Sequence, residues 1–126
     1  MAQSANYLGD LARVEGDYPL AGAFYEESLP LFRIQGGKSE IPAVIHNIGY
    51  VALAANNYKE AEAAFRESLI LQQDIGNKLG ISECLTGFAA LAAAWGDPTR
   101  AARLFSASEA LRSAVGAYMW PAEQIE

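Results

Sequence analysis

The sequence predicts an all-α fold of three helix–turn–helix repeats, about six helices in all, stacked one against the next. One observation is a period of 40 residues, and a second is that apolar residues such as Ile41, Ile45 and Ile48 recur at steps of three and four, the spacing of one helix face. A fixed period in this range is typical of a solenoid, whose units bury their apolar faces only against their neighbours. Five positions are identical in all three copies: Ala12/Ala52/Ala92, Ala21/Ala61/Ala101, Ser28/Ser68/Ser108, Leu31/Leu71/Leu111 and Gly36/Gly76/Gly116.

The first helix of each pair ends at a short polar turn. Asp17, Asn57 and Asp97 in these turns can accept hydrogen bonds from the free N–H groups that open the second helix. Asn57 has Glu60 three residues later, as in a capping box, and Pro98 stands at a first helical position, where its missing N–H costs nothing. Helices are therefore expected over residues 4–15, 18–35, 39–55, 58–75, 78–95 and 98–115.

The second helix of each pair is expected to end at a glycine. Gly36, Gly76 and Gly116 can adopt the left-handed conformation that terminates a helix. Pro30 lies inside the first of these helices, removes a hydrogen bond to the carbonyl of Glu26, and predicts a bend. The chain is thus expected to be a single domain and part of a larger protein, with repeats over about 1–37, 38–77 and 78–117 and a short tail, 118–126.

Composition excludes several classes of protein. An apolar fraction of 52% with 19% charged residues is the opposite of the balance found in disordered chains. No apolar run approaches the roughly 18 residues that a membrane span needs, and the first residues lack the pattern of a secretory signal. The single cysteine, Cys84, cannot form an internal disulfide, so a cytoplasmic protein without membrane contact is expected.

The charge pattern argues against direct binding of nucleic acid. The formal net charge is −6, and the nine Lys and Arg residues are dispersed along the chain and never adjacent. Nucleic-acid binding depends on clustered cations that displace counterions from phosphates. Any link to DNA is expected to run through another domain or protein.

The first unit carries the motifs Leu8-Gly9 and Gly16-Asp17-Tyr18, and the second carries Ile48-Gly49 and Asn57-Tyr58 at the same offsets. With these motifs the repeat unit resembles the tetratricopeptide repeat. The resemblance covers nearly the whole chain, although the third copy is weaker, with Pro98 in place of tyrosine and Glu109 in place of leucine. It implies a right-handed superhelix and a protein-binding role. Units of 40 residues are also similar to those in the sensory regions of large bacterial LuxR-like transcriptional regulators. The residues that carry the resemblance are Leu8-Gly9, Ala12, Gly16-Asp17-Tyr18, Ala21, Tyr25, Ser28-Leu29 and Leu31, then Asn47-Ile48-Gly49, Ala52, Asn57-Tyr58, Ala61, Phe65, Ser68-Leu69 and Leu71.

No residue pattern points to catalysis, a metal or a cofactor. One histidine, His46, with Cys84 has no metal-ligand spacing, and a lone histidine cannot activate three serines. Ser28, Ser68 and Ser108 are expected to bond the carbonyl four residues back in their own helices. His46 is interpreted as a plain surface or groove contact, and Cys84 as a small apolar filler.

By the resemblance, the inner surface of the superhelix is formed by the first helix of each unit. Some family members bind a C-terminal carboxylate there through lysine and arginine, but Asn6, Asp10 and Asn47 hold those positions here, so this activity is not expected. Tyr50 and His46 suit a peptide or helix of mixed polar and apolar character. The candidate partner-binding residues are Asn6, Asp10, Arg13, His46, Asn47, Tyr50, Leu53, Glu83, Thr86 and Ala90.

Two functions remain open. The first is a non-catalytic protein–protein interaction module that binds a peptide or helix in its concave groove. The alternative is a small-ligand sensor domain of a bacterial transcriptional regulator. The apolar residues of the last helix, among them Leu104 and Phe105, also predict a homodimer or a concentration-dependent mixed state with a symmetric two-fold contact, unless Tyr118, Met119 and Trp120 cover them.

Overall fold

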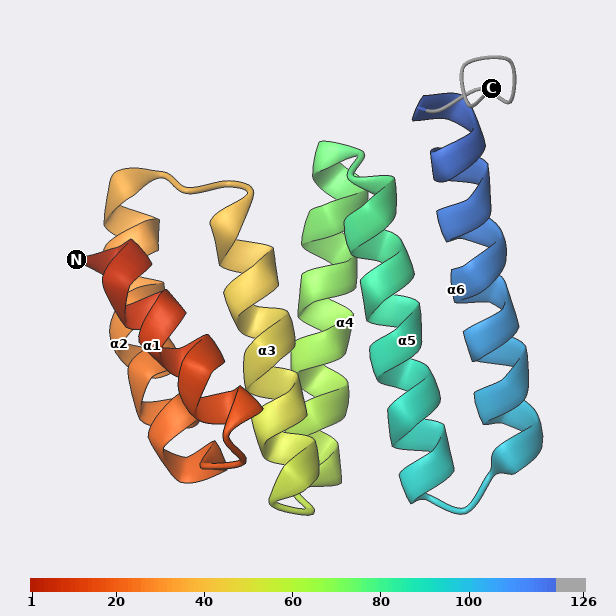
Figure 1. The fold of residues 1–126 in the computed structure, drawn as a ribbon, viewed down its shortest axis with the longest axis horizontal. Helices are drawn as coiled ribbons and strands as arrows, with labels where there is room; N and C mark the ends of the chain where they lie inside the picture. The colour runs from red at the N-terminus through yellow and green to blue at the C-terminus, as the bar shows by residue number, and fades with distance from the viewer. Residues whose placement is uncertain (120–126) are drawn as a thin grey trace.

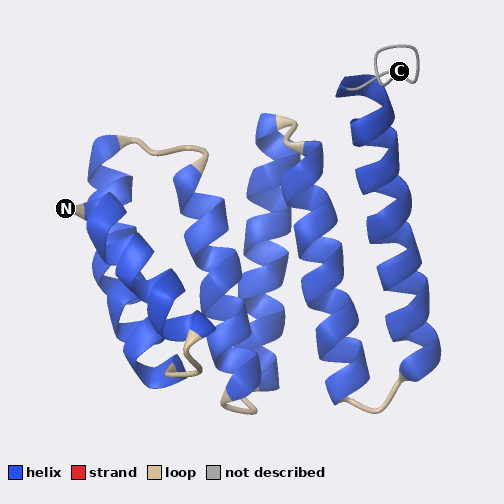
Figure 2. Ribbon diagram, viewed as in Figure 1, coloured by secondary structure: helices blue, strands red, loops and turns tan. Residues whose placement is uncertain are grey.

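The computed structural model describes the backbone of residues 1–119 and the side chains of residues 1–116, and this part of the chain is helical apart from short turns (Figure 2). The expected all-α class is confirmed, and the observed bounds lie within four residues of the expected ones. The elements are α1 (Ala2–Val14), α2 (Tyr18–Gln35), α3 (Glu40–Ala54), α4 (Tyr58–Ile75), α5 (Lys78–Ala94) and α6 (Pro98–Met119).

The helices pack in sequential pairs that form a row (Figure 1). The pairs are α1–α2, α3–α4 and α5–α6, and each pair contacts the next through α2–α3 and α4–α5. The first helices α3 and α5 also contact each other. No helix within residues 1–119 is long and apolar enough to cross a membrane.

The turns inside the pairs are built as expected in two of the three cases. Asp17 accepts a hydrogen bond from the backbone N–H of Leu20 (3.2 Å), and Asp97 accepts one from the N–H of Arg100 (3.1 Å). The capping box at Asn57 is not formed, because Asn57 makes no side-chain bond to the helix that it precedes. That turn is held instead by its backbone, where the N–H of Asn57 donates to the carbonyl of Ala52 (2.8 Å).

Two of the three expected terminal glycines end a helix. Gly36 (φ 72°) and Gly76 (φ 70°) adopt the left-handed conformation after α2 and α4. The prediction for Gly116 is wrong, because α6 continues through it to Met119. Gly76 is followed by Asn77, which caps the next helix by accepting from the N–H of Gly80 (3.1 Å), whereas Ala, Tyr and Met after Gly116 can all continue a helix. The expected covering role of Tyr118, Met119 and Trp120 concerns side chains outside the described residues.

Two of the three equivalent buried serines form hydrogen bonds between helices, and one bonds within its own helix. Ser28 donates to a carbonyl three residues back in its own helix (3.0 Å), not four as expected. Ser68 donates to the carbonyl of Pro42 (2.7 Å) and Ser108 to that of Ser82 (2.8 Å), so both bonds tie the second helix to the first helix of the same pair. The small side chain allows the close approach that these bonds need.

The core is centred on two aromatic residues at equivalent positions. Tyr25 and Phe65 are both fully buried, each in a cluster of alanines and aliphatic side chains. Each ring lies against a glycine of the first helix of its own pair. A Cβ at Gly9 would lie 2.7 Å from Cε1 of Tyr25, and one at Gly49 would lie 2.6 Å from Cε1 of Phe65. Glycine is therefore required at both positions by the packing of the ring.

We expect alanine substitutions at two helical glycines to have opposite signs. Gly49→Ala should lower the free energy of unfolding by about 1–3 kcal/mol, because the new methyl group overlaps Phe65. Gly116→Ala should raise it by about 0.5–1 kcal/mol, since a Cβ there meets no described atom within 4 Å and alanine favours the helix. Urea denaturation of both variants checks this. A loss of stability in Gly116→Ala would mean that α6 ends at that residue.

Candidate partner-binding groove

A hollow of about 310 Å³ lies where the first helices of all three units meet. Its walls come from α1, α3 and α5, together with the first residue of α2. We call it the first-helix groove, and it is lined by Arg13, Tyr18, Tyr50, Leu53, Ala54 and Ala90.

A hydrogen-bonded polar cluster lies beside the groove. The hydroxyl of Tyr25 donates to Oδ1 of Asp10 (2.6 Å), and Nε of Arg13 donates to the same hydroxyl (3.1 Å). Nδ2 of Asn47 on α3 donates to Oδ1 of Asp10 (3.3 Å), which links the first helices of units one and two. Arg13 also lies 3.8 Å from Asp10, and both side chains remain about one third exposed. The cluster therefore holds a cation and an anion in fixed positions while leaving part of each accessible.

The environment keeps Tyr25 and Arg13 protonated near neutral pH. Burial, and next the hydrogen bond to Asp10, raises the pKa of Tyr25 to about 12, so its hydroxyl stays protonated and remains a donor. Burial acts to lower the pKa of Arg13, but its hydrogen bond to Tyr25 and the charge of Asp10 outweigh burial and raise it. The cluster is thus a stable ion pair bridged by a neutral phenol.

His46 does not lie on the surface of the groove. Its side chain is only 6% exposed, with ring centroids 4.9 Å from Tyr50 and 5.3 Å from Phe65. Burial, and then the charge of Arg13, lowers the pKa of His46 to about 4. Its Nδ1 has no hydrogen-bond partner among the described residues. The expectation of a surface or groove contact is therefore corrected: His46 is a neutral core residue between units two and three.

The structure brings together some of the other expected site residues and separates the rest. Arg13, Tyr50, Leu53 and Ala90 line the groove, whereas Asp10 and Asn47 are engaged in the polar cluster beside it. Asn6, Glu83 and Thr86 do not line it. Asn6 is half-buried, and Glu83 is exposed.

Thr86 instead belongs to a polar contact between α5 and α6. Its Oγ1 lies 2.7 Å from Oγ of Ser108 and donates to the carbonyl of Ser82 (3.3 Å). Ser82 and Ser108 are fully buried, so this contact joins the last helix pair internally. A partner in the groove is therefore not needed to satisfy Thr86.

Sequence reasoning missed three residues of this region. Tyr18 and Ala54 line the groove but were not among the expected partner-binding residues. Tyr25 was named only as part of the family resemblance, yet its hydroxyl joins Asp10 and Arg13 in the polar cluster. A signal was present, because Phe65 and Phe105 stand at the equivalent positions and the extra hydroxyl of Tyr25 needs a partner when buried.

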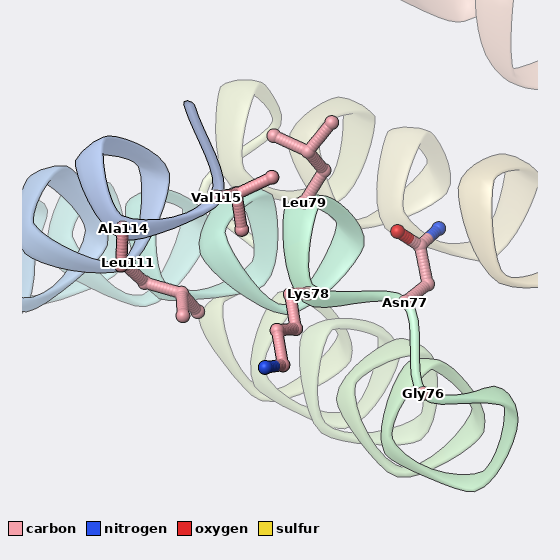
Figure 3. Close-up of a pocket in the computed structure, with 7 residues that line it drawn as sticks. All are labelled: Gly76, Asn77, Lys78, Leu79, Leu111, Ala114 and Val115. Carbon is pink, nitrogen blue, oxygen red and sulfur yellow. The ribbon is translucent and has the colours of Figure 1, made fainter. Parts of the chain in front are cut away.

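A second hollow, of about 590 Å³, lies between the start of α5 and the far half of α6 (Figure 3). A smaller one of about 350 Å³ repeats it 40 residues earlier, with Lys38, Leu71 and Ile75 at the positions of Lys78, Leu111 and Val115. Asp74 of the smaller hollow is replaced by Ala114, so Lys78 has no equivalent acidic neighbour in the lining. The larger hollow is lined by Gly76, Asn77, Lys78, Leu79, Leu111, Ala114 and Val115.

The buried thiol and the acidic residues do not form a reactive site. Burial raises the pKa of Cys84, whose Sγ donates to Oγ of Ser68 (3.4 Å), so the thiol stays protonated. Within the described part of the chain, no group of three or more His, Cys, Asp or Glu side chains is placed to hold a metal ion.

Two comparisons with known proteins find helical-repeat relatives, in agreement with the helix pairs of the structure. The sequence profile described as "Tetratricopeptide repeat" matches residues 1–69 and, in a second alignment, residues 40–114. No curated protein shows significant similarity to the chain. Among solved structures, the chain is similar to BtubC (BKLC) from P. vanneervenii, with a TM-score of 0.75 and 20% sequence identity. The match covers 93% of this chain and 48% of the other, so the chain spans about half the length of that protein. Because the two profile matches together extend over most of the sequence, the chain belongs to the tetratricopeptide repeat family.

Proposed function

We propose that the chain is a non-catalytic protein–protein interaction module that binds a peptide or a short helix in the first-helix groove. The observation that carries this proposal is the hollow to which all three units contribute, through Arg13, Tyr50, Leu53 and Ala90. Domains of this family are generally protein–protein interaction modules. A site shared by three units depends on their stacking, which gives the repeat architecture a role in binding.

The chemistry of the groove suits a segment of mixed character. Tyr18 and Tyr50 offer aromatic surface with a polar end, and Leu53 with Ala90 offers an apolar wall. Arg13 and Asp10 are fixed at one edge, where a polar group of the partner can meet either charge. The volume of about 310 Å³ lies at the lower limit of small-molecule pockets, about 300–1,000 Å³, so it is better suited to side chains of a longer partner than to a whole metabolite.

One observation favours the alternative of a small-ligand sensor. The hollow at Lys78 and Leu111 has a volume of about 590 Å³, which is within the range of small-molecule pockets. It offers an apolar wall and one ammonium group, a combination that suits an anionic metabolite with an apolar part. In that reading the chain is the sensory part of a bacterial transcriptional regulator.

We expect a charge placed inside the groove to weaken the binding of peptides selected from a random displayed library. Ala90→Glu should weaken the binding of such peptides at least about tenfold, because a partner apolar group would then meet an unpaired carboxylate. Ala94→Glu, one helical turn further along α5 and exposed, is the matched control and should bind like the unchanged protein. Isothermal titration of both variants measures the difference.

The result also separates the two functions. If Ala90→Glu and Ala94→Glu bind the selected peptide with equal affinity, the groove is not the binding site. If no peptide is selected, and an anionic metabolite raises the melting temperature of the protein but not that of Lys78→Ala, the sensor function is supported instead.

A further inference from the structure

The third unit exposes an aromatic side chain that the first two units bury. Tyr25, Phe65 and Phe105 stand at equivalent positions of the repeat. Tyr25 and Phe65 have no exposed surface, whereas Phe105 is 52% exposed. The three rings have nearly the same size, so the difference comes from their surroundings: Ala89 stands where Gly9 and Gly49 lie against the other two rings, and the helix that covers the ring also differs.

The cover is the first helix of the following unit. A Cβ at Gly87 of α5 would lie 2.8 Å from Cε1 of Phe65, and the ring of Phe88 lies 5.9 Å from that of Phe65. No helix among the described residues takes this place over Phe105. Phe105 instead lines an open apolar hollow of about 430 Å³ together with alanines of α5 and α6. We call this the α5–α6 face; besides Phe105 and Thr86, it is lined by Ala89, Ala90, Ala93, Ala101 and Ala102.

The opposite end of the row exposes the complementary surface. Leu8 and Leu11 of α1 are 46% and 56% exposed. The residues at the position of Leu11 in the later units pack against the preceding unit: Cγ1 of Val51 lies 3.2 Å from the place of a Cβ at Gly22, and Leu91 is only 2% exposed. The α1 face, defined by Leu8 and Leu11, is therefore the half of the inter-unit contact for which this chain holds no partner among its described residues.

We propose that a second copy of this chain docks its α1 face on the α5–α6 face of the first, in a head-to-tail contact. The argument is continuity with an interface that the chain already forms twice, at α2–α3 and α4–α5. Ala102 stands at the position of Gly22, which lies beside Val51, and its side chain is small enough for Leu11 to lie next to it. Apolar surface on both sides is then removed from water, which drives association.

The same register places the bulky Tyr7 of the incoming helix next to Phe105. Tyr7 of the second copy would stand where Asn47 stands in the second unit. At this position Asn47 donates to Asp10 of unit one, whereas Gly87 lies so close to Phe65 that a Cβ would be 2.8 Å from its ring, so Tyr7 requires the incoming helix to lie further from Phe105 than α5 lies from Phe65. Tyr7 is 62% exposed in the single chain and Phe105 is half-exposed, so both rings are accessible for contact.

A head-to-tail contact has a consequence that a two-fold contact lacks. Each added copy covers one exposed face of the assembly and leaves its own second face free for a further copy. The assembly therefore grows with concentration unless the rotation between copies closes a ring. This arrangement differs from the symmetric dimer that the sequence alone suggested. It goes beyond the proposed function, because it concerns the two ends of the row; Ala90 lines both the groove and the α5–α6 face, and the variants that test this contact leave it unchanged.

The test uses two variants, each of which blocks one face. Leu11→Glu disrupts the α1 face and Phe105→Glu disrupts the α5–α6 face. Size exclusion with light scattering should show that the mass of the unchanged protein rises with concentration above the 13.5 kDa of one chain. Each variant alone should remain at 13.5 kDa, since it lacks one of the two required surfaces. An equimolar mixture should form a dimer and stop there, because each variant retains the surface that the other needs.

Several results would overturn the proposal. A monomer mass for the unchanged protein at all concentrations rejects self-association. A dimer of Leu11→Glu alone, or of Phe105→Glu alone, indicates a two-fold contact through the remaining face. A mixture that stays monomeric also rejects the head-to-tail contact, provided that both variants melt like the unchanged protein. Leu8→Glu and Ala101→Glu replace either variant that fails to fold, since they place the same charge on the same two faces.

Discussion

Phe65→Ala is expected to lower the free energy of unfolding by about 3–5 kcal/mol, the usual cost of deleting a buried phenylalanine. Phe65 is fully buried and contacts the rings of His46, Tyr50 and Phe88. These residues come from units two and three, so the substitution leaves a cavity at the contact between them. In a solenoid, stability is the sum of unit and inter-unit terms, and both are weakened here.

The matched control is Phe105→Ala, which removes the same side chain at the equivalent position of unit three. It should cost only about 1 kcal/mol, because Phe105 is 52% exposed and half of its apolar surface is already in water. Urea denaturation followed by circular dichroism, at a concentration where the protein is monomeric, measures both values. Equal losses in the two variants would contradict the assignment of Phe65 to the core and of Phe105 to an open face.

The second large effect is a loss of stability in acid that is caused by His46. Its pKa is about 4 in the folded chain and 6.5 as the ordinary value, so the unfolded chain binds the proton more readily. The contribution of neutral His46 is fully present above about pH 6.5 and is lost as the pH falls toward 4. A difference of roughly 2.5 pKa units corresponds to about 3 kcal/mol.

His46→Leu isolates this effect from the titration of the carboxylates. Leucine cannot be protonated, and it removes the buried Nδ1 that has no partner among the described residues. The unfolding free energy of the unchanged protein should therefore fall by about 3 kcal/mol more than that of His46→Leu between pH 7 and pH 4. Parallel curves for the two proteins would show that His46 is protonated as easily in the folded chain as in the unfolded one.

The helices could be predicted from the sequence because their determinants are local. Apolar residues three and four apart define each helix, and Gly36 and Gly76 end two of them in the left-handed conformation. Gly116 matches them in position, yet the residues that follow decide whether a helix stops, and no capping residue follows Gly116 directly. The repeat period therefore predicted the helix pairs, and the largest error in a helix bound is at the end of the last helix.

The candidate site was predicted less well than the helices, because residues of one helix can face different neighbours and the sequence does not show which neighbour covers each of them. Arg13, Tyr50, Leu53 and Ala90 lie in the groove, as expected from their places on the first helices. His46 is on the same helix as Tyr50, one turn away, but it lies against Phe65 and close to Gly87. Only the approach of α5 covers it, and the position of α5 is a property of the stacked units.

The sequence by itself determined the helix-pair unit, its three copies and the small residues that let the pairs approach, because these depend on spacing along one helix and on residue size. Tertiary structure alone decided that the hydroxyl of Tyr25 joins Asp10 to Arg13, and that Ser68 and Ser108 bond across a helix pair. It also decided that Phe65 is buried while Phe105 is exposed. The physical reason is that a periodic sequence gives equivalent residues the same local preference, whereas their burial and partners depend on whether a neighbouring unit lies against them.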